Sequence, residues 1–309
     1  MKTCSVVIPA YRSQATLVEL TDRLSQVLPH EFEKFEVIII NDGSPDQTWD
    51  CIEGLAKKYP WVRGVNLMRN YGQHNATLCG ILQAKYELIV TMDDDLQHPP
   101  EEIPHLIAKL EEGYDVVYGI PNTKVHNWWR TWFSSWIKKL LSFVMGVKSM
   151  RGIGSFRAFK SKLRKAFIGF NKPEVIVDIL LSWGTHKFGY VSVEENPRLQ
   201  GQSNYSFRKL MQLAFTVLTG FSTAPLRFTS FVGFFFMLFG IAAFIYVLVV
   251  YFTAGSVLGF SFLASLISIL NGALLFALGI FGEYLARIFE RTSERPCYSI
   301  DQTTDREAE

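Results

Sequence analysis

The 309-residue chain lacks several features that would assign it to a class at once. Its formal net charge is only +2 at pH 7, so overall charge gives no reason to expect a nucleic-acid partner. Neither a GxxxxGK[ST] phosphate loop nor a GxGxxG motif occurs, which disfavours an ATPase and a dinucleotide-dependent enzyme. No internal repeat and no low-complexity segment is present.

Cysteine is scarce, and its spacing is uninformative. The four cysteines contain no CxxC pair and no metal-binding spacing, so we expect reduced thiols and no disulfide. The first residues also lack the long apolar core of a signal peptide, because only the short run SVVIPA separates Lys2 from Tyr11. That run is expected to form a first β-strand.

Charged residues are absent from two long stretches, 228–252 and 256–282. Each exceeds the roughly 20 residues that span a bilayer, so two transmembrane helices are predicted, with a pair of buried core helices as the alternative. The connector between them has no Lys or Arg, whereas Arg227 precedes the first stretch and three arginines between 287 and 295 follow the second. The positive-inside rule therefore predicts a multi-pass protein of the cytoplasmic (inner) membrane, with both flanks in the cytoplasm.

Two further segments are predicted to contact the membrane surface. Residues 128–145 hold four of the seven tryptophans, and Trp128, Trp132 and Trp136 share one helical face, with basic residues nearby. This composition is typical of a helix lying in the membrane interface, although a Trp-rich core helix would give the same pattern. Residues 205–226 begin with basic residues and continue with apolar ones, which favours a juxtamembrane helix.

The first 120 residues alternate short apolar runs with stretches of helical character. Strands are expected at 5–9, 36–40, 62–68, 87–92 and 115–119, and helices at 14–28, 46–59, 71–84 and 101–112. Such alternation predicts an α/β domain with a mostly parallel sheet covered on both faces. Ligands of these sheets bind at the carboxyl ends of the strands, so polar residues that follow strands are the candidates for a site.

Three adjacent carboxylates, Asp93, Asp94 and Asp95, follow the apolar run 88–90. Residues i and i+2 of a strand point the same way, so Asp93 and Asp95 are expected on one side, with Gln97 continuing it and Asp94 pointing elsewhere. Two carboxylates and an amide oxygen suit Mg²⁺ or Mn²⁺. A solvated turn or a helix cap is the plainer interpretation of the same residues.

A second acidic strand end follows residues 37–40, where Asn41 and Asp42 precede Gly43. An acidic side chain in this position can hold a ribose hydroxyl or the edge of a base. An Asx turn closed by the glycine is the alternative.

Five segments, taken in order, resemble the family 2 glycosyltransferases of the GT-A fold: VVIPAYRS, IIINDGS, RNYGQHNATLCGI, MDDDLQHPPEEIPHLI and EGYDVVYG. The two apolar stretches and the ending GEYLARIFERTSERPCY narrow the resemblance to polyprenyl-phosphate glycosyltransferases. These include bactoprenol glucosyltransferases, undecaprenyl-phosphate aminoarabinose-type transferases and, more distantly, dolichol-phosphate mannose synthase. RNYGQH, DLQHPPEEIP and YSFRKL are most similar to the aminoarabinose-type branch.

The resemblance covers nearly the whole chain and implies a Rossmann-like GT-A domain in the cytoplasm, followed by two transmembrane helices. The expected parts are a GT-A domain, a juxtamembrane helix, a transmembrane hairpin and a cytoplasmic tail, at residues 1–204, 205–226, 227–286 and 287–309. The implied activity is transfer of a sugar, with inversion, from a nucleotide-sugar to polyprenyl (undecaprenyl) phosphate. A UDP-sugar is favoured by similarity to the bacterial branch, and the product would serve envelope glycan modification.

The resemblance also implies roles for individual residues. Asp93, Asp95 and Gln97 match the metal motif that holds Mg²⁺ or Mn²⁺ on the donor diphosphate, and Asp95, Ser155 and Arg157 are expected at the catalytic centre. The expected donor-binding residues are Pro9, Ala10, Tyr11, Asp42, Asp93, Asp94 and Arg198. The acceptor phosphate is largely dianionic at neutral pH and needs cations that position it. The candidates are Lys124, Arg130, Arg151 and Arg157.

The chain departs from the pattern of these relatives at several positions. PAYRS replaces PxYNE, Pro121 stands where many members have Arg, Ser155 where the glucosyltransferase branch has Asp, and Asn204 where a Lys is usual. These changes leave the sugar open and favour, as an alternative, a non-catalytic membrane scaffold derived from the fold. A processive polysaccharide synthase is disfavoured because no QxxRW motif occurs. The oligomeric state stays open, a homo-oligomer included.

Overall fold

The computed structural model describes residues 2–121, 154–167, 176–196, 224–254, 259–292 and 296–305. The chain divides into two compact units, one formed by residues 1–204 together with 294–309, the other by residues 205–293. The predicted interfacial helix at 128–145 lies outside the described residues, as does most of the predicted juxtamembrane helix, from 205 to 223.

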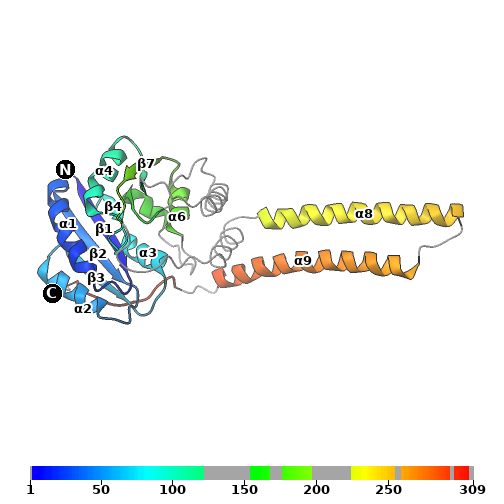
Figure 1. Ribbon diagram of the computed structural model, residues 1–309, viewed down its shortest axis with the longest axis horizontal. Helices are drawn as coiled ribbons and strands as arrows, with labels where there is room; N and C mark the ends of the chain where they lie inside the picture. The colour runs from blue at the N-terminus through cyan, green and yellow to red at the C-terminus, as the bar shows by residue number, and fades with distance from the viewer. Residues whose placement is uncertain are drawn as a thin grey trace. The chain divides into compact units, whose positions relative to one another are not determined.

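In the described part of the first unit, eight strands form one sheet in the order β7-β5-β6-β4-β1-β2-β3-β8 (Figure 1). The strands are β1 (Thr3–Ala10), β2 (Lys34–Asn41), β3 (Val62–Leu67), β4 (Leu88–Thr91), β5 (Val116–Pro121), β6 (Arg157–Lys160), β7 (Phe188–Val193) and β8 (Ile300–Thr303). The pairings β1–β2, β1–β4, β2–β3 and β5–β7 are parallel, whereas β6 runs antiparallel between β4 and β5. The predicted mostly parallel α/β sheet is confirmed.

Helices cover both faces of this sheet (Figure 1). One face carries α1 (Leu17–Glu31), α2 (Thr48–Lys58) and α4 (Ile103–Glu111), the last preceded by the 3₁₀ turn η1 (Pro100–Glu102). The other face carries α3 (Gln73–Gln83), the 3₁₀ helix η2 (Ser161–Ala166) and α6 (Val177–Gly184). The central strand β1 is largely apolar because its successive side chains enter opposite cores: Val6 and Ile8 lie in the core with α1, whereas Val7 lies in the core with α3.

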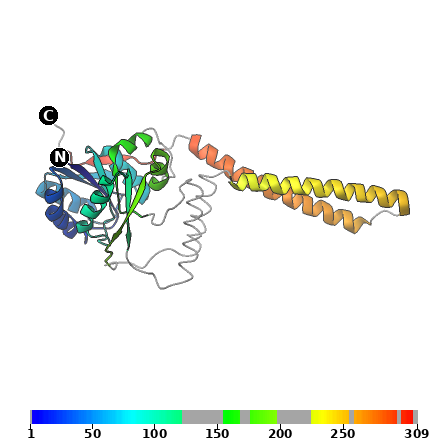
Figure 2. The same cartoon turned by 90° about the horizontal axis from the view of Figure 1, so that it is seen from above.

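The segment 296–305 follows the apolar helices in sequence but belongs to the first unit. Its strand β8 pairs antiparallel with β3, at the edge of the sheet, and lies beside the blue strands in Figure 2. The expected tail from residue 287 is therefore divided: residues 287–292 continue the second apolar helix, and residues 296–305 extend the sheet.

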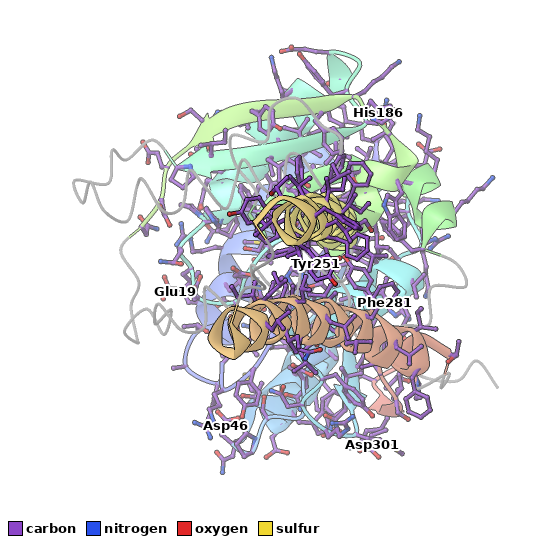
Figure 3. The ribbon with its side chains drawn as sticks, turned by 90° about the vertical axis from the view of Figure 1, so that its right-hand side faces the viewer. Glu19, Asp46, His186, Tyr251, Phe281 and Asp301 are labelled. Atoms are coloured by element: carbon purple, nitrogen blue, oxygen red, sulfur yellow. The ribbon has the colours of Figure 1, made fainter. Side chains whose placement is uncertain are left out.

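The second unit contains two long helices, α8 (Ala224–Ala254) and α9 (Phe260–Thr292). Their apolar windows are Phe228–Thr253, with a mean hydropathy of 2.6, and Ile269–Ala286, with a mean hydropathy of 1.6. Large apolar side chains project into the surroundings; Figure 3 labels Tyr251 on α8 and Phe281 on α9, which are 54% and 57% exposed. By length and composition, both helices can cross a bilayer, and an apolar surface of this kind suits lipid better than water.

Candidate functional site

A pocket of about 260 Å³ lies at the carboxyl ends of β1, β2 and β4, beside the N-terminus of α3. Its lining consists of Pro9, Ala10, Tyr11, Asp42, Asn70, Gly72, Gln73, Asp93, Asp94 and Asp95. This is the edge of a parallel sheet at which ligands are expected to bind. All three adjacent carboxylates thus contribute to one pocket.

Asp93 is held from two directions. Gln73 Nε2 donates to its Oδ1 over 2.5 Å, and the Ser155 hydroxyl donates to its Oδ2 over 2.5 Å. The second contact follows from strand register, since Thr91 on β4 lies opposite Arg157 on β6. Continuing the antiparallel pairing by two residues brings Ser155 opposite Asp93.

Asp94 points toward a different part of the pocket from the partners of Asp93. Its Oδ2 accepts a hydrogen bond from the Ser13 hydroxyl and one from the Tyr11 backbone N–H at 3.3 Å. Burial raises the pKa of Asp94 to about 6, and the negative charge of Asp93 acts in the same direction, while the hydrogen bonds from Ser13 and Tyr11 oppose the rise. Asp94 is therefore a partly buried carboxylate beside a second one, Asp93.

Asp95 is fixed by an unusual loop. Its Oδ1 accepts the backbone N–H of Gln97 at 3.1 Å, and Leu96 between them has a φ of 59° and is almost fully buried. A non-glycine residue in this conformation is strained by of order 1–3 kcal/mol, which the surrounding packing must offset. Gln97 itself is not among the lining residues; its carbonyl accepts the Asn196 backbone N–H at 2.8 Å, which ties the loop to the segment after β7.

The donor set fits a divalent cation held by few protein ligands. Among the described residues, no three His, Cys, Asp or Glu side chains converge as a complete metal cage. Asp93 and Asp95 nevertheless line the same pocket as Asp94, so three carboxylates lie close together there. Mg²⁺ is commonly bound in this way, by one or two carboxylates with the remaining positions left to water and phosphate oxygens.

Asp42 organises the loop that closes the pocket opposite the carboxylates. Its two oxygens accept the backbone N–H groups of Tyr71 and Gly72, at 2.7 and 2.9 Å. Burial raises the pKa of Asp42, and these two hydrogen bonds oppose the rise. Asp42 lines the pocket as expected, and each of its carboxylate oxygens accepts one backbone N–H of the Tyr71–Gly72 segment.

Arg157 lies away from solvent, with only 2% of its surface exposed. Its guanidinium pairs with Asp178 on α6 and donates through Nε to Thr91 Oγ1 at 3.0 Å. The buried Arg157 side chain therefore does not line the pocket and can affect it only through other residues. Its expected place in catalysis, like that of Asp95 and Ser155, stays a prediction.

The remaining predicted residues divide into two groups. Pro9, Ala10 and Tyr11 line the pocket, whereas Arg198, Lys124, Arg130 and Arg151 lie outside the described residues. Sequence reasoning missed three lining residues, Asn70, Gly72 and Gln73. They follow the carboxyl end of β3, so the same strand-end argument that singled out Asp42 and Asp93 could have found them.

A mostly parallel sheet with an acidic pocket at its strand ends defines an α/β protein with a candidate ligand site at the place expected for open α/β sheets. Residues 5–167 match the model of glycosyl transferase family 2. The chain is 36% identical, over 96% of its length and 91% of the relative, to an undecaprenyl-phosphate 4-deoxy-4-formamido-L-arabinose transferase of Shewanella sediminis. A relative of the same name in Pseudomonas savastanoi is 33% identical, with 98% and 91% covered. The chain therefore belongs to glycosyl transferase family 2 and is a glycosyltransferase.

One solved structure supports this fold. A mycobacterial protein superposes with a TM-score of 0.50 at 18% identity, covering 71% of this chain and 73% of its own. Glucosyl-3-phosphoglycerate synthase of Mycobacterium tuberculosis, in complex with Mn²⁺ and uridine-diphosphate-glucose, gives a TM-score of 0.49 at 16% identity, covering 71% and 77%.

Proposed function

We propose that this glycosyltransferase moves a sugar from a nucleotide-sugar to undecaprenyl phosphate at the cytoplasmic face of a membrane, with inversion at the anomeric carbon. The observation that carries the proposal is the combination of an acidic strand-end pocket with two apolar helices in a single chain. Near-full-length similarity to transferases named for undecaprenyl phosphate supports the choice of acceptor.

The donor would occupy the pocket between the 9–11 backbone and the 70–73 loop. Gly72 caps α3 and Gln73 begins it, and the dipole of this helix favours a negatively charged diphosphate near its N-terminus. Asp42 holds this loop in place through the Tyr71 and Gly72 backbone, and Tyr11 offers an aromatic ring beside the pocket. We take a UDP-sugar as the first donor to test, and Arg198 as a further donor ligand.

Asp93 and Asp95, with Gln97 nearby, would hold a Mg²⁺ or Mn²⁺ ion. When bound, such an ion supplies positive charge that offsets the charge developing on the leaving nucleoside diphosphate. The role of the protein is to orient the two carboxylates. Gln73 and Ser155 fix the orientation of the Asp93 carboxylate by donating a hydrogen bond to each of its oxygens.

The acceptor needs little help from a general base. A phosphate monoester is largely dianionic at neutral pH, so it can attack the sugar once it is positioned. Ser155 places a neutral hydroxyl beside Asp93 and adds no carboxylate there. We assign the positioning of the phosphate to Lys124, Arg130 and Arg151, with Asp95 and Ser155 at the reacting centre.

The order of elements along the chain supports a hairpin in the membrane. The apolar helices α8 and α9 separate the catalytic sheet from β8, and β8 pairs with β3 of that same sheet. If α8 crosses the bilayer, α9 must cross back for this pairing to form. Arginines flank the hairpin on the side of the catalytic domain, which makes that side cytoplasmic by the positive-inside rule.

The names of the relatives supply the first candidate for the sugar, a nucleotide-activated 4-deoxy-4-formamido-L-arabinose. The test is a transfer assay with purified protein in detergent, given undecaprenyl phosphate, Mg²⁺ or Mn²⁺ and a panel of labelled UDP- and GDP-sugars that includes this one. Label is expected to enter the lipid phase, and EDTA is expected to abolish the transfer.

Other outcomes separate the alternatives. Metal-dependent nucleotide binding without transfer would indicate a sugar outside the panel. Formation of a polymer would indicate a processive synthase. If the folded protein neither binds nucleotide nor transfers sugar, the proposal is wrong, and the non-catalytic membrane scaffold becomes the favoured alternative.

A further inference from the structure

A chain of hydrogen bonds leads from a buried ion pair to the pocket carboxylate Asp93. Asp178 on α6 pairs with the guanidinium of Arg157, whose Nε donates to Thr91 Oγ1 at 3.0 Å. Thr91 Oγ1 in turn donates to the carbonyl oxygen of Ser155 at 2.6 Å. The Ser155 hydroxyl then donates to Asp93 Oδ2 at 2.5 Å, so every link is a direct contact.

This chain of hydrogen bonds follows from the register of β4 and β6. Thr91 on β4 and Arg157 on β6 are antiparallel partners, so their side chains lie side by side on one face of the sheet. Asp93 and Ser155 follow the same pairing by two residues on each strand, and a step of two residues returns a side chain to the same face. Asp178 packs onto this face from α6, beside Tyr118, whose hydroxyl donates to it at 2.8 Å.

Burial and chemistry fix the direction of each bond. Arg157, Asp178 and Thr91 are 2%, 3% and 1% exposed. A guanidinium can only donate and stays protonated, so no proton can pass along the chain. Because Thr91 Oγ1 accepts from Arg157, its own proton is left for the Ser155 carbonyl. The chain can therefore orient Ser155 but cannot relay charge.

We propose that Arg157, Thr91 and Ser155 are positioning residues that hold the Asp93 carboxylate in the orientation required to bind a divalent cation. This inference rests on the proposed metal-dependent function. It gives the buried Arg157 a role that acts through Ser155 and not on the substrate. It also makes α6 part of the support for the pocket, although α6 supplies none of the residues in its lining.

The test measures Mn²⁺ affinity and needs no sugar donor. Full-length protein in detergent is titrated with Mn²⁺, and the free ion is followed by electron paramagnetic resonance. Thr91→Val and Ser155→Ala are each expected to weaken binding about 10-fold, as loss of an outer partner of a metal ligand typically does. The double variant is expected to bind Mn²⁺ as tightly as the weaker-binding of the two single variants, because both substitutions break the same chain of hydrogen bonds. Thr91→Ser and Ser155→Thr keep the hydroxyl and should restore affinity.

Matched controls remove buried hydroxyls elsewhere. Thr21 and Ser182 donate to carbonyl oxygens within their own helices, both at 2.7 Å, so Thr21→Val and Ser182→Ala should leave Mn²⁺ affinity unchanged. Arg157 is not substituted, because its loss would leave Asp178 buried without its charge partner. Melting temperatures without metal show that each variant is folded.

Three results would overturn the inference. If the single variants bind Mn²⁺ as the wild type does, or if their effects multiply in the double variant, the chain does not position Asp93, and the proposed function is unaffected. If the wild type binds no Mn²⁺ at millimolar concentration, the inference and the metal dependence of the proposed function fail together.

Discussion

Gly43 adopts a φ of 60° in the turn after β2, and a Cβ built there would lie 2.3 Å from the carbonyl carbon of Arg69 and 2.5 Å from the backbone nitrogen of Asn70. Both obstacles are backbone atoms and cannot rotate away. They belong to the loop that Asp42 holds and that lines the pocket. Any side chain at this position must therefore displace the loop from the turn.

We expect Gly43→Ala to lower the free energy of unfolding by about 1–3 kcal/mol, from the strain of a left-handed residue and the forced movement of the loop. Nucleotide affinity should fall as well, because the loop carries Asn70 and Gly72 of the pocket. Denaturation and nucleotide titration measure the two effects.

Gly54→Ala is the matched control. Gly54 lies in α2 with nothing within 4 Å of a built Cβ, so alanine should stabilise the helix by up to about 1 kcal/mol. Equal behaviour of the two variants would refute the argument.

Asp95 provides the second residue-scale prediction. Asp95→Ala removes a carboxylate from the pocket and leaves the buried core untouched, since the side chain lies at the lining. Transfer is expected to fall at least about 100-fold, while the melting temperature without metal stays close to that of the wild type. Glu112→Ala, which removes an exposed carboxylate paired with Lys109, serves as the control. Retention of most activity by Asp95→Ala would remove Asp95 from the catalytic set.

Asp115 gives a prediction about pH. Burial alone would raise the pKa of Asp115, but hydrogen bonds from Lys162, Lys160 and Thr185 outweigh it and lower the pKa to about 2. A carboxyl with a depressed folded pKa stabilises the fold above its unfolded pKa of about 4, and this stability is lost as the pH falls from about 4 to 2. The two lysines are partly exposed, so we discount the full linkage value to roughly 1 kcal/mol. Asp115→Asn should flatten that part of the acid-unfolding curve, and an unchanged curve would contradict the assignment.

The sequence predicts the position of the site better than its contacts. Asp42, Asp93 and Asp95 are predictable because each closes an apolar strand, which is a local signal. The contact of Ser155 with Asp93 depends on the pairing of β4 with β6, between residues more than 60 positions apart. The ion pair of Arg157 with Asp178 also joins distant segments, and nothing in the run SFRAFK indicates that its arginine is buried.

At the scale of elements, the central strands β1 to β5 are predictable for a physical reason. Both of their faces are largely buried, so most of them contain a short and nearly continuous apolar run near the expected residues, although Arg63 and Asn66 interrupt β3. Strands β6, β7 and β8 were not expected. RAFK is short and carries charge, and IDQT is polar and exposed at the edge of the sheet. Their conformation comes from the strands they pair with.

Strand β8 is held to the sheet by an ion-pair network centred on Arg63. Its Nε and Nη2 donate to the two carboxylate oxygens of Asp305, both at 2.6 Å, and its Nη1 donates to Glu36 at 3.0 Å. Glu36 is 4% exposed and also accepts from Ser5 and the Lys85 backbone. The inner pair is therefore buried and the outer pair is partly exposed.

We expect Arg63→Ala to cost about 3 kcal/mol of stability, because it leaves the buried Glu36 carboxylate without its cation. Asp305→Ala breaks only the outer pair and should cost about 1 kcal/mol or less. Thermal unfolding in detergent compares the two variants. Arg63→Ala combined with Glu36→Gln should recover part of the loss, since the buried charge is then gone. If both single variants cost the same, the buried part of the network contributes nothing specific.

At the scale of the whole molecule, the pairing of β8 with β3 constrains the path of the chain through a membrane. Residues before α8 and residues after α9 belong to one sheet, so both lie on the same side of any bilayer that the helices cross. The positive-inside rule leads to the same hairpin, but that prediction depends on a few arginines that flank the apolar helices. The sheet pairing adds an independent mechanical reason.

This constraint predicts opposite accessibility for two exposed positions. In a variant whose four natural cysteines are replaced by serine, Thr253→Cys places a thiol at the end of α8, and Thr303→Cys places one on β8. A membrane-impermeant thiol reagent should label only Thr253→Cys in right-side-out vesicles and only Thr303→Cys in inverted vesicles. A charged reagent cannot cross about 30 Å of hydrocarbon, so labelling of a thiol shows on which side of the membrane that residue lies. If both thiols are labelled in the same vesicles, α8 does not separate them across the bilayer, and the two helices lie on the membrane or within the protein. If Thr303→Cys is labelled only in right-side-out vesicles, the hairpin crosses the membrane in the opposite orientation, and the catalytic pocket lies outside.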